Sequence, residues 1–405
     1  MGETVRKLET TVYESILSTR DGIMLRVINV VGARPNFMKM APIIEAMQKY
    51  PEQFQHLLVH TGQHYDEAMS KSFFADLGMP KPDLNLEVGS GSHAAQTARI
   101  MMEFEKVCLN HAPDLVIVVG DVNSTMACTI TAKKLGIKVA HVEAGLRSRD
   151  MSMPEEVNRL CTDVLCDYLF TTDHFADENL IAEGVSTEKI FFVGNVMIDT
   201  LLKHQELARG LGLIEKWGLK PRGFATLTLH RPSNVDDPAI LRGILDALNE
   251  IGKEIPIVFA IHPRTRKMVK QFQFGEYLSS TEKPQGLWVT DPLGYLEFLH
   301  LNMNAMMVIT DSGGLQEETT VLGVPCITLR SNTERPITCE VGTNVIAGNS
   351  KESILRHAFR VLKGDIPRGK VPEKWDGRAA ERIVQILANL DARPIEPHRI
   401  VGPML

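Results

Sequence analysis

Short apolar runs rich in β-branched residues alternate along the chain with longer amphipathic stretches. A run such as Leu115–Val119 is apolar at every position, which is typical of a parallel strand that is covered on both faces. Eleven strands are predicted: Leu25–Val31, His56–His60, Leu115–Val119, Lys138–Val142, Tyr168–Thr171, Ile190–Val193, Ala225–Leu229, Ile257–Ile261, Leu287–Thr290, Ala305–Thr310 and Pro325–Leu329. Strands that alternate with helices predict an α/β fold with parallel sheets.

Eleven strands are too many for one doubly wound sheet of ordinary size, and 405 residues exceed the ~250–300 at which a single core stops growing. The strands pause between about Asp199 and Arg222, in a polar segment. We therefore predict two Rossmann-like, doubly wound domains that face each other across a cleft. The predicted units are an N-terminal extension (1–23), an N-terminal domain (24–205), a C-terminal domain (206–375), and a helix with a tail (376–405) that packs back on the N-terminal domain.

Composition excludes several classes of protein. The net charge of −6 argues against a nucleic-acid or anionic-membrane partner, because either requires a basic surface. No apolar stretch approaches the ~18 residues that span a bilayer, and the start of the chain is polar, so neither a membrane span nor a signal peptide is expected. The six cysteines form no CxxC pair and lie mostly in apolar runs, which predicts reduced core residues of a cytoplasmic protein.

The segment DSGGLQEE (311–318) follows a predicted strand and indicates a glycine turn that leads into a helix. Glycines and the first free N–H groups of a helix bind phosphate, and the helix dipole favours its negative charge. Its glutamates, Glu317 and Glu318, would lie one turn inside the helix, where a carboxylate can accept hydrogen bonds from a ribose diol. The segment therefore predicts a nucleotide site, with an ordinary strand-to-helix turn as the alternative. Its candidate binding residues are Ser312, Gly313, Gly314 and Glu318.

Residues able to transfer protons follow several predicted strands. Asp121, Glu143 and His230 come soon after the ends of three strands, and Glu155 lies at a helix start that Pro154 predicts. Open α/β sheets bind ligands at the carboxyl ends of their strands, so these side chains are expected to meet across the cleft. For each residue alone, a helix cap or a structural ion pair is the alternative interpretation.

A set of basic residues is predicted to bind phosphate. Arg34 and Lys39 follow a glycine turn after the first strand, and His262, Arg264 and Arg335 lie in two other strand-end loops. Arginine binds phosphate oxygens with a rigid fork, whereas lysine acts as a point charge. A solvated or structural role is equally open for Lys39 and Arg264. The chain contains neither GxxxxGK[ST] nor GxGxxG, so ATPase or dehydrogenase chemistry is not predicted.

With these segments aligned, the chain resembles the non-hydrolysing UDP-N-acetylglucosamine 2-epimerases from about Leu25 to Gly348. The matching blocks are GARPNFMKMAPI, TGQHYD, VVGDVNST, HVEAGLRS, MPEEVNR, FFVGNVMID, LHRPSN, VTDPLGYLEF, TDSGGLQEE and GVPCITLRSNTERP. The resemblance implies the two-domain glycosyltransferase B fold. It also implies a homodimer that interconverts UDP-N-acetylglucosamine and UDP-N-acetylmannosamine without a metal or nicotinamide cofactor, supplying an activated sugar for cell-surface polysaccharides.

Residue by residue, the resemblance assigns roles to the candidate positions. Asp121, Glu143, Glu155 and His230 match catalytic positions of the family. The matching nucleotide-binding positions are Arg34, Lys39, Ser312, Gly313, Gly314, Glu318 and Arg335, and Phe298 matches the residue near the uracil. Gln63 and His64 match part of a regulatory UDP-sugar site found in some bacterial members, whereas Tyr65 departs from it. The family eliminates UDP to give a 2-acetamidoglucal and then adds it back, so one group takes a proton and another supplies one.

Other functions remain open from the sequence. A hydrolysing relative would admit water and release N-acetylmannosamine and UDP. A retaining glycosyltransferase would require an acceptor-binding surface, and a nucleotide-sugar sensor would not need three carboxylates and a histidine. The sugar is also open, because another UDP-hexosamine, such as a diacetamido uronic acid, would fit the same pattern.

Overall fold

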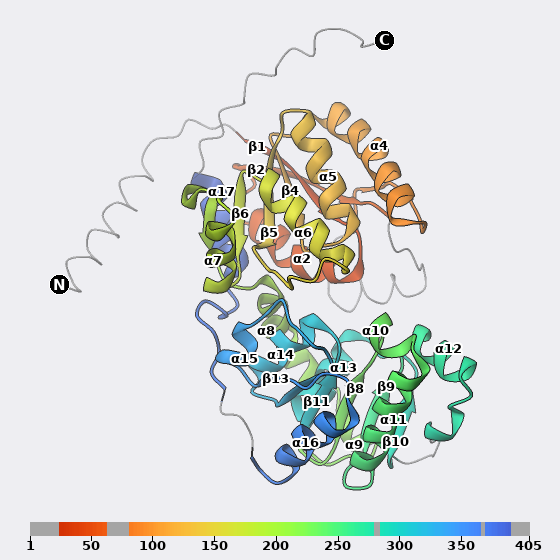
Figure 1. The fold of residues 1–405 in the computed structure, drawn as a ribbon. Coiled ribbons are helices and arrows are strands. Elements are labelled where there is room, and N and C mark those ends of the chain that lie inside the picture. Colours follow the sequence, from red (N-terminus) through yellow and green to blue (C-terminus); the bar gives the residue numbers. More distant parts are fainter. Residues whose placement is uncertain (1–23, 63–80, 279–283, 366–368, 390–405) are drawn as a thin grey trace, which may run out of the picture.

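The computed structural model describes residues 24–62, 81–278, 284–365 and 369–389. In this part of the chain, two parallel β-sheets with interleaved helices lie one beyond the other (Figure 1). The N-terminal part of the chain forms the first sheet and the C-terminal part forms the second. The prediction of an α/β protein with two Rossmann-like domains is confirmed.

The first sheet has seven strands in the order β3-β2-β1-β4-β5-β6-β7. Its strands are β1 (Leu25–Val31), β2 (Phe54–His60), β3 (Leu84–Asn85), β4 (Leu115–Val119), β5 (Lys138–Ala144), β6 (Tyr168–Thr171) and β7 (Ile190–Phe192). The helices are α2 (Arg34–Gln48), α4 (His93–His111), α5 (Asn123–Lys134), α6 (Pro154–Leu165), α7 (His174–Ala182), η1 (Thr187–Lys189) and α8 (Val196–Arg209). The strand order reverses between β1 and β4, and ligands bind at such a switch point in this kind of sheet.

The second sheet repeats this plan with six strands in the order β10-β9-β8-β11-β12-β13. Its strands are β8 (Ala225–Thr228), β9 (Ile257–Ala260), β10 (Leu287–Thr290), β11 (Met307–Thr310), β12 (Cys326–Thr328) and β13 (Asn344–Ile346). The helices are α9 (Leu213–Lys216), α10 (Pro232–Val235), α11 (Pro238–Gly252), α12 (Pro263–Gln271), η2 (Gly275–Tyr277), α13 (Tyr295–Asn304), α14 (Gly313–Leu322), α15 (Ile337–Glu340) and α16 (Lys351–Leu362). The last helix, α17 (Ala379–Asn389), packs on the first domain. Its switch point lies between β8 and β11.

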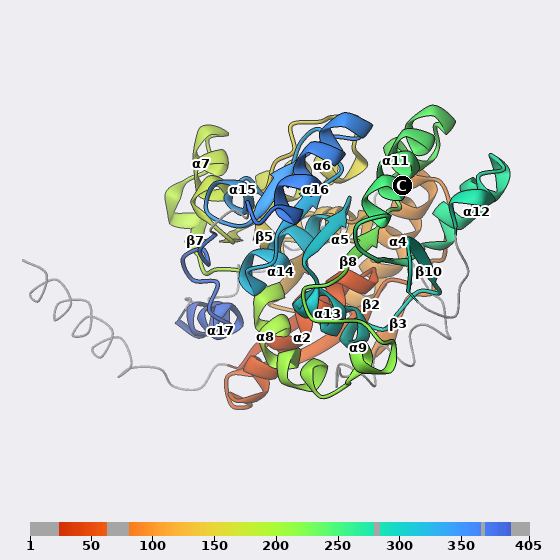
Figure 2. The same cartoon turned by 90° about the horizontal axis from the view of Figure 1, so that it is seen from below.

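Both faces of the first sheet are covered by helices, because successive side chains of a strand point to opposite faces. Leu115 and Ile117 of β4 pack in one apolar cluster with residues of α2. Val116 and Val118 of the same strand pack in another cluster, with residues of α4 such as Phe104. Burial on both faces explains the continuous apolar run that predicted this strand. Figure 2 shows the helices around the strands from below.

Two strands, β3 and β13, were not predicted from the sequence. They contain two and three residues and lie at the edges of the sheets. A segment this short contains no apolar run that distinguishes it from a loop.

Helices α8 and α17 connect the two halves of the molecule. Val196 and Met197 of α8 pack in the core of the first domain, whereas Leu201 packs with residues of the second domain. The Asp199 carboxylate on α8 accepts hydrogen bonds from the first two backbone amides of α17 at 3.1 and 2.7 Å. The C-terminal helix therefore packs on the first domain (Figure 1). The predicted boundary at residues 205/206 lies inside α8, a helix that packs against both domains. The exact domain limits stay a prediction.

All six cysteines are free thiols. Among the described residues, the helices lack the length and apolar character needed to cross a bilayer.

Candidate active site

The candidate residues gather where the carboxyl ends of the central strands of the two sheets meet. Lys39 lies on α2, which follows β1, and Asp121 follows β4. His230 follows β8, and the turn before α14 follows β11. These four strands flank the two switch points, so the topology itself brings the two sets of residues to one place.

Glu143 lies near the end of β5 in an unusual backbone conformation. Its φ angle is +72°, a value that is costly for any residue except glycine. The pairing of β5 with β6 shifts in register between Val142 and Ala144, which is the mark of a β-bulge. A bulge redirects a side chain at the end of a strand, and here it directs the Glu143 carboxylate toward two cations.

These two cations are Lys39 and Arg335. Lys39 Nζ lies 2.5 Å from Glu143 Oε2, and Arg335 Nη2 lies 3.0 Å from Glu143 Oε1. Burial raises the pKa of this carboxylate, but the charges of Lys39 and Arg335 outweigh burial and lower its pKa below the usual range. Arg335 lies in the loop between β12 and α15 of the second domain, whereas Glu143 lies on β5 of the first. This ion pair therefore joins the two domains.

Arg335 is surrounded by acidic groups. Its Nε lies 2.8 Å from Glu317 Oε1, and its Nη1 lies 2.5 Å from Glu334 Oε1. Glu334 in turn pairs with Arg330 at 2.8 Å. Burial raises the pKa of Glu317 to about 7, although Arg335 opposes this shift. Glu317 therefore holds the guanidinium and is not directed at a ribose, contrary to our expectation for this glutamate.

Helix α14 begins at Gly313, directly beside the guanidinium. A Cβ atom at Gly313 would lie 2.6 Å from Arg335 Nη1 and 2.9 Å from Glu334 Oε1, so a side chain there would require the guanidinium or the carboxylate to move. The amide of Ser312 donates to Thr310 Oγ1 at 2.9 Å. The amides at the start of α14 are the ones that a helix leaves without intrahelical acceptors, so they can bind an anion.

Glu318 is buried one turn further along α14. Burial, together with the smaller effect of the Glu317 charge, raises its pKa to about 8, and the nearby Tyr295 hydroxyl opposes the shift. Phe298 on α13 packs against the apolar cluster that contains Leu315, a residue in the first turn of α14. A buried carboxylate and an aromatic ring thus flank the start of this helix.

His230 is fixed by Asp311, the first residue after β11. His230 Nδ1 lies 2.9 Å from Asp311 Oδ1, and Asp311 Oδ2 accepts from the backbone amides of His230 and Arg231 at 2.9 and 2.8 Å. Burial raises the pKa of Asp311, but its hydrogen bonds to His230 outweigh burial and lower it. The imidazole is thereby oriented, with Nε2 as its remaining nitrogen.

The other two candidate carboxylates differ in their surroundings. Asp121 Oδ2 lies 2.5 Å from Arg159 Nη1. Glu155 lies in the first turn of α6, and within the described ranges its side chain has no recorded hydrogen bond or ion pair. The neighbouring Glu156 is buried and pairs with Arg159 at 2.6 Å.

Some candidates lie outside the network centred on Arg335. Arg34 is exposed at the start of α2. Arg264 forms an exposed ion pair with Asp236. His262 caps α12 and lies 5.5 Å from His230 between ring centres. The candidate regulatory residues, Gln63 and His64, lie outside the described residues.

Sequence reasoning missed most of the roles of the groups that hold the candidate side chains in place. These groups are Glu156, Arg159, Asp311, Glu317 and Glu334. Asp311 could have been found, since it is the first polar residue after a buried strand. Glu156 and Arg159 have the helical spacing of an ion pair, but the sequence does not show that Arg159 reaches Asp121.

A family model described as UDP-N-acetylglucosamine 2-epimerase matches residues 45–388, which is well over half of the chain. The chain belongs to the UDP-N-acetylglucosamine 2-epimerase family. A family member from Methanocaldococcus jannaschii, a UDP-N-acetylglucosamine 2-epimerase, is 43% identical over 363 residues, covering 88% of this chain and 97% of that protein. The UDP-2,3-diacetamido-2,3-dideoxy-D-glucuronate 2-epimerase of Pseudomonas aeruginosa is 40% identical over 372 residues, covering 90% of this chain and 100% of that protein.

Solved structures of the epimerase family share the fold. The crystal structure of the Methanocaldococcus jannaschii UDP-GlcNAc 2-epimerase in complex with UDP-GlcNAc and UDP has a TM-score of 0.81 and 42% identity, covering 90% of this chain and 99% of that chain. The Neisseria meningitidis UDP-GlcNAc 2-epimerase bound to UDP-GlcNAc has a TM-score of 0.81 and 27% identity, covering 90% and 100%.

The raised pKa of Glu318 predicts a pH-dependent effect on stability. The folded protein binds this proton more tightly than the unfolded chain, so stability falls as pH rises from about 4.5 through about 8. Glu318→Gln cannot ionise, so it should raise the Tm more at pH 8.5 than at pH 5 in thermal unfolding. The exposed Glu254→Gln serves as the control. An equal Tm change at both pH values would contradict the assigned cause.

Proposed function

We propose that the protein catalyses the reversible C2 epimerisation of UDP-N-acetylglucosamine to UDP-N-acetylmannosamine without net hydrolysis. The observation that carries the proposal is the contact of a buried carboxylate of the first domain, Glu143, with a cation and a helix start of the second domain, Arg335 and α14. Glu143 touches Arg335 at 3.0 Å, and Arg335 lies against the Gly313 backbone. Proton-transfer groups and diphosphate-binding groups are thus adjacent.

The proposed reaction proceeds by elimination and re-addition. A base takes the C2 proton, the C2–H electron pair forms the C1=C2 double bond, and the C1–O electrons leave with UDP. The resulting 2-acetamidoglucal takes UDP back at C1 while an acid delivers a proton to the other face of C2. The proposed proton-transfer groups are Asp121, Glu143 and Glu155. Their carboxylates have different partners, which suits a reaction in which one group takes a proton and another supplies one.

The diphosphate leaving group gains charge as the C1–O bond breaks. Arg335, Lys39 and Arg34 are proposed to stabilise this charge, together with the amides at the start of α14. His230 is oriented through Nδ1 by Asp311, which leaves Nε2 for the substrate. For the nucleoside, Glu318 is proposed to bind the ribose and Phe298 to pack near the uracil, with Ser312, Gly314, His262 and Arg264 at the edge of the site.

A second candidate substrate is UDP-2,3-diacetamido-2,3-dideoxy-D-glucuronate. The observation that favours it is the 40% identity to the Pseudomonas aeruginosa 2-epimerase of that name over 90% of this chain. The same elimination applies to it, because the reacting C1–C2 unit is the same. A hydrolysing outcome would require water to compete with UDP for the glucal. For either sugar, we propose a cytoplasmic enzyme that supplies activated sugars for cell-surface polysaccharides.

In deuterated water, substrate and product should both gain deuterium at C2, because the proton that returns to C2 comes from a group that exchanges with solvent. NMR of the purified protein with UDP-N-acetylglucosamine would measure this, with UDP-2,3-diacetamido-2,3-dideoxy-D-glucuronate tested in parallel. Only traces of free UDP are expected. Epimerisation with full retention of the C2 hydrogen would contradict the mechanism, and abundant free N-acetylmannosamine would favour the hydrolase.

Gly313→Val should weaken UDP binding, because its Cβ atom would lie 2.6 Å from Arg335 Nη1 and displace the guanidinium. Arg335→Ala should also weaken binding, by the ~1.5–3 kcal/mol typical of a charge-assisted hydrogen bond. Isothermal titration calorimetry with UDP measures both. Asp121→Asn serves as the control, since it should lower kcat by ~10²-fold or more and leave UDP affinity within a few-fold. Normal UDP affinity in both Gly313→Val and Arg335→Ala would mean that the diphosphate lies elsewhere.

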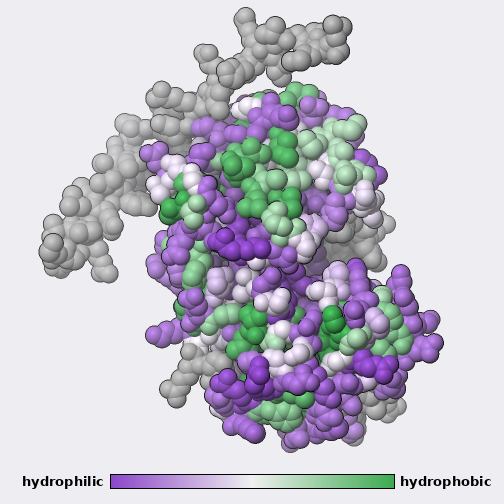
Figure 3. Space-filling model, in the orientation of Figure 1, coloured by the Kyte–Doolittle hydropathy of each residue, from purple (hydrophilic) through white to green (hydrophobic). Residues whose placement is uncertain are grey.

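We also propose that the protein is a homodimer joined through α4, α5 and α6. Met102 and Leu109 on α4 have exposed fractions of 63% and 60%, and Val164 on α6 has 70%. α5 lies between these helices, and Figure 3 shows apolar residues gathered over this part of the first domain. A contiguous exposed apolar face of this kind marks a protein interface.

Val164→Glu combined with Met102→Glu should convert the dimer to a monomer, because a charge on each helix would be buried without a partner. Analytical ultracentrifugation measures the mass directly. The control is Leu207→Glu, an exposed apolar position on α8 that should leave the dimer intact. A wild-type monomer, or a dimer that only Leu207→Glu disrupts, would contradict this interface.

A further inference from the structure

Arg159 is a buried arginine that holds the Asp121 carboxylate. Its Nη1 lies 2.5 Å from Asp121 Oδ2, and the two side chains are 2% and 26% exposed. The preceding residue, Asn158, donates from Nδ2 to the backbone carbonyl of Asp121 at 2.8 Å. Two consecutive residues of α6 therefore fix both the backbone and the carboxylate of Asp121.

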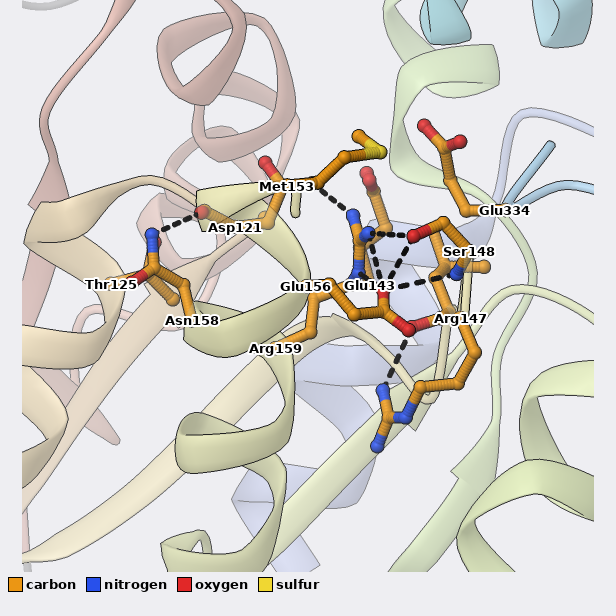
Figure 4. A network of polar contacts seen from close by, with 12 residues as sticks. Asp121, Thr125, Glu143, Arg147, Ser148, Met153, Glu156, Asn158, Arg159 and Glu334 are labelled. Carbon is orange, nitrogen blue, oxygen red and sulfur yellow. Dashed lines mark hydrogen bonds and ion pairs between the residues drawn. The ribbon is translucent and has the colours of Figure 1, made fainter. Parts of the chain in front are cut away.

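The guanidinium is itself anchored from the opposite side. Arg159 Nε and Nη2 donate to Glu156 Oε2 at 3.0 and 2.6 Å. Glu156 also accepts from the Ser148 amide and hydroxyl, both at 3.0 Å, and from the Arg149 amide at 2.8 Å. Figure 4 shows these side chains in one polar network. The backbone after β5 thus sets the position of Glu156, and Glu156 sets the direction of Arg159.

This arrangement leaves one oxygen of Asp121 available. Arg159 occupies Oδ2, whereas the described residues provide no recorded partner for Oδ1, on a side chain that is partly exposed. Charged groups of other elements also act on the pair. The charge of Glu334 raises the pKa of Arg159, and the charge of Asp121 raises the pKa of Arg335.

We propose that Arg159 is a positioning residue for the epimerisation. It holds Asp121 Oδ2 and so directs Oδ1 of the same carboxylate toward the sugar, with which Oδ1 exchanges a proton. The inference rests on the proposed function, because it assigns Asp121 a proton-transfer task. A lysine would not replace Arg159, since a single ammonium cannot pair with Asp121 and Glu156 through separate nitrogens of a rigid fork.

Arg159→Met removes the charge and keeps an unbranched apolar side chain in place of the stem of the arginine. We expect kcat with UDP-N-acetylglucosamine to fall ~10²-fold or more, with KM within a few-fold of wild type. The matched control is Arg149→Met, whose exposed side chain bonds only Asn179 among the described residues and should leave kcat near wild type.

Two further variants separate positioning from folding. Arg159→Lys keeps the buried charge and should fold, with activity between Arg159→Met and wild type. Arg159→Ala should regain activity when methylguanidinium is added, and an unfolded protein would not respond. If Arg159→Met matches Arg149→Met in kcat, the proposal is overturned. It is equally overturned if Arg159→Lys retains wild-type activity.

A readout without turnover distinguishes this inference from the proposed function. Crystal structures of wild type and Arg159→Met without substrate report the orientation of the Asp121 carboxylate. In Arg159→Met this carboxylate should turn away from its wild-type orientation even if wild type does not epimerise the substrate, a result that would refute only the proposed function. An unchanged orientation in an active wild-type background would refute only the role of Arg159.

Discussion

The buried ion pair between Glu143 and Arg335 joins the two domains, and the candidate active site depends on it. The residues are 192 positions apart in the chain and 3.0 Å apart in the structure. Removing one partner of a buried pair leaves an uncompensated charge, which costs ~3–5 kcal/mol. Lys39, Glu317 and Glu334 complete the cluster around this pair. Opposite charges alternate through it, so each carboxylate lies next to a cation despite its burial.

The ion pair between Glu143 and Arg335 also explains the strained backbone at Glu143. A non-glycine residue at φ +72° persists only where the surrounding structure determines it. Here Val142 and Ala144, which pair with β6, fix the backbone on either side of Glu143, and the two cations fix its carboxylate. At Gly313, where α14 begins, a Cβ atom would lie 2.6 Å from Arg335 Nη1. The bulged end of β5 and the start of α14 therefore both lie where the two domains meet.

Much of the fold followed from the sequence. Continuous apolar runs predicted eleven of the strands, because a strand buried on both faces is apolar at every position. The edge strands β3 and β13 were missed since two or three residues form no pattern. Open α/β sheets bind ligands at the carboxyl ends of their strands. This rule also predicted that Asp121, Glu143 and His230 lie at strand ends, where the structure has them. It did not predict that Glu317 pairs with Arg335, because neighbouring positions on a helix look equivalent until a partner is known.

The sequence by itself determined the class of fold, the family, and the candidate side chains with their chemistry. All three can be read from local composition and from the order of the motifs along the chain. Only the tertiary structure decided which charge pairs with which: Arg159 with Asp121, Arg335 with Glu143, and His230 with Asp311. The physical reason is that an ion pair requires atoms within a few ångströms, and for residues far apart in sequence the packing of the sheets and helices sets that distance.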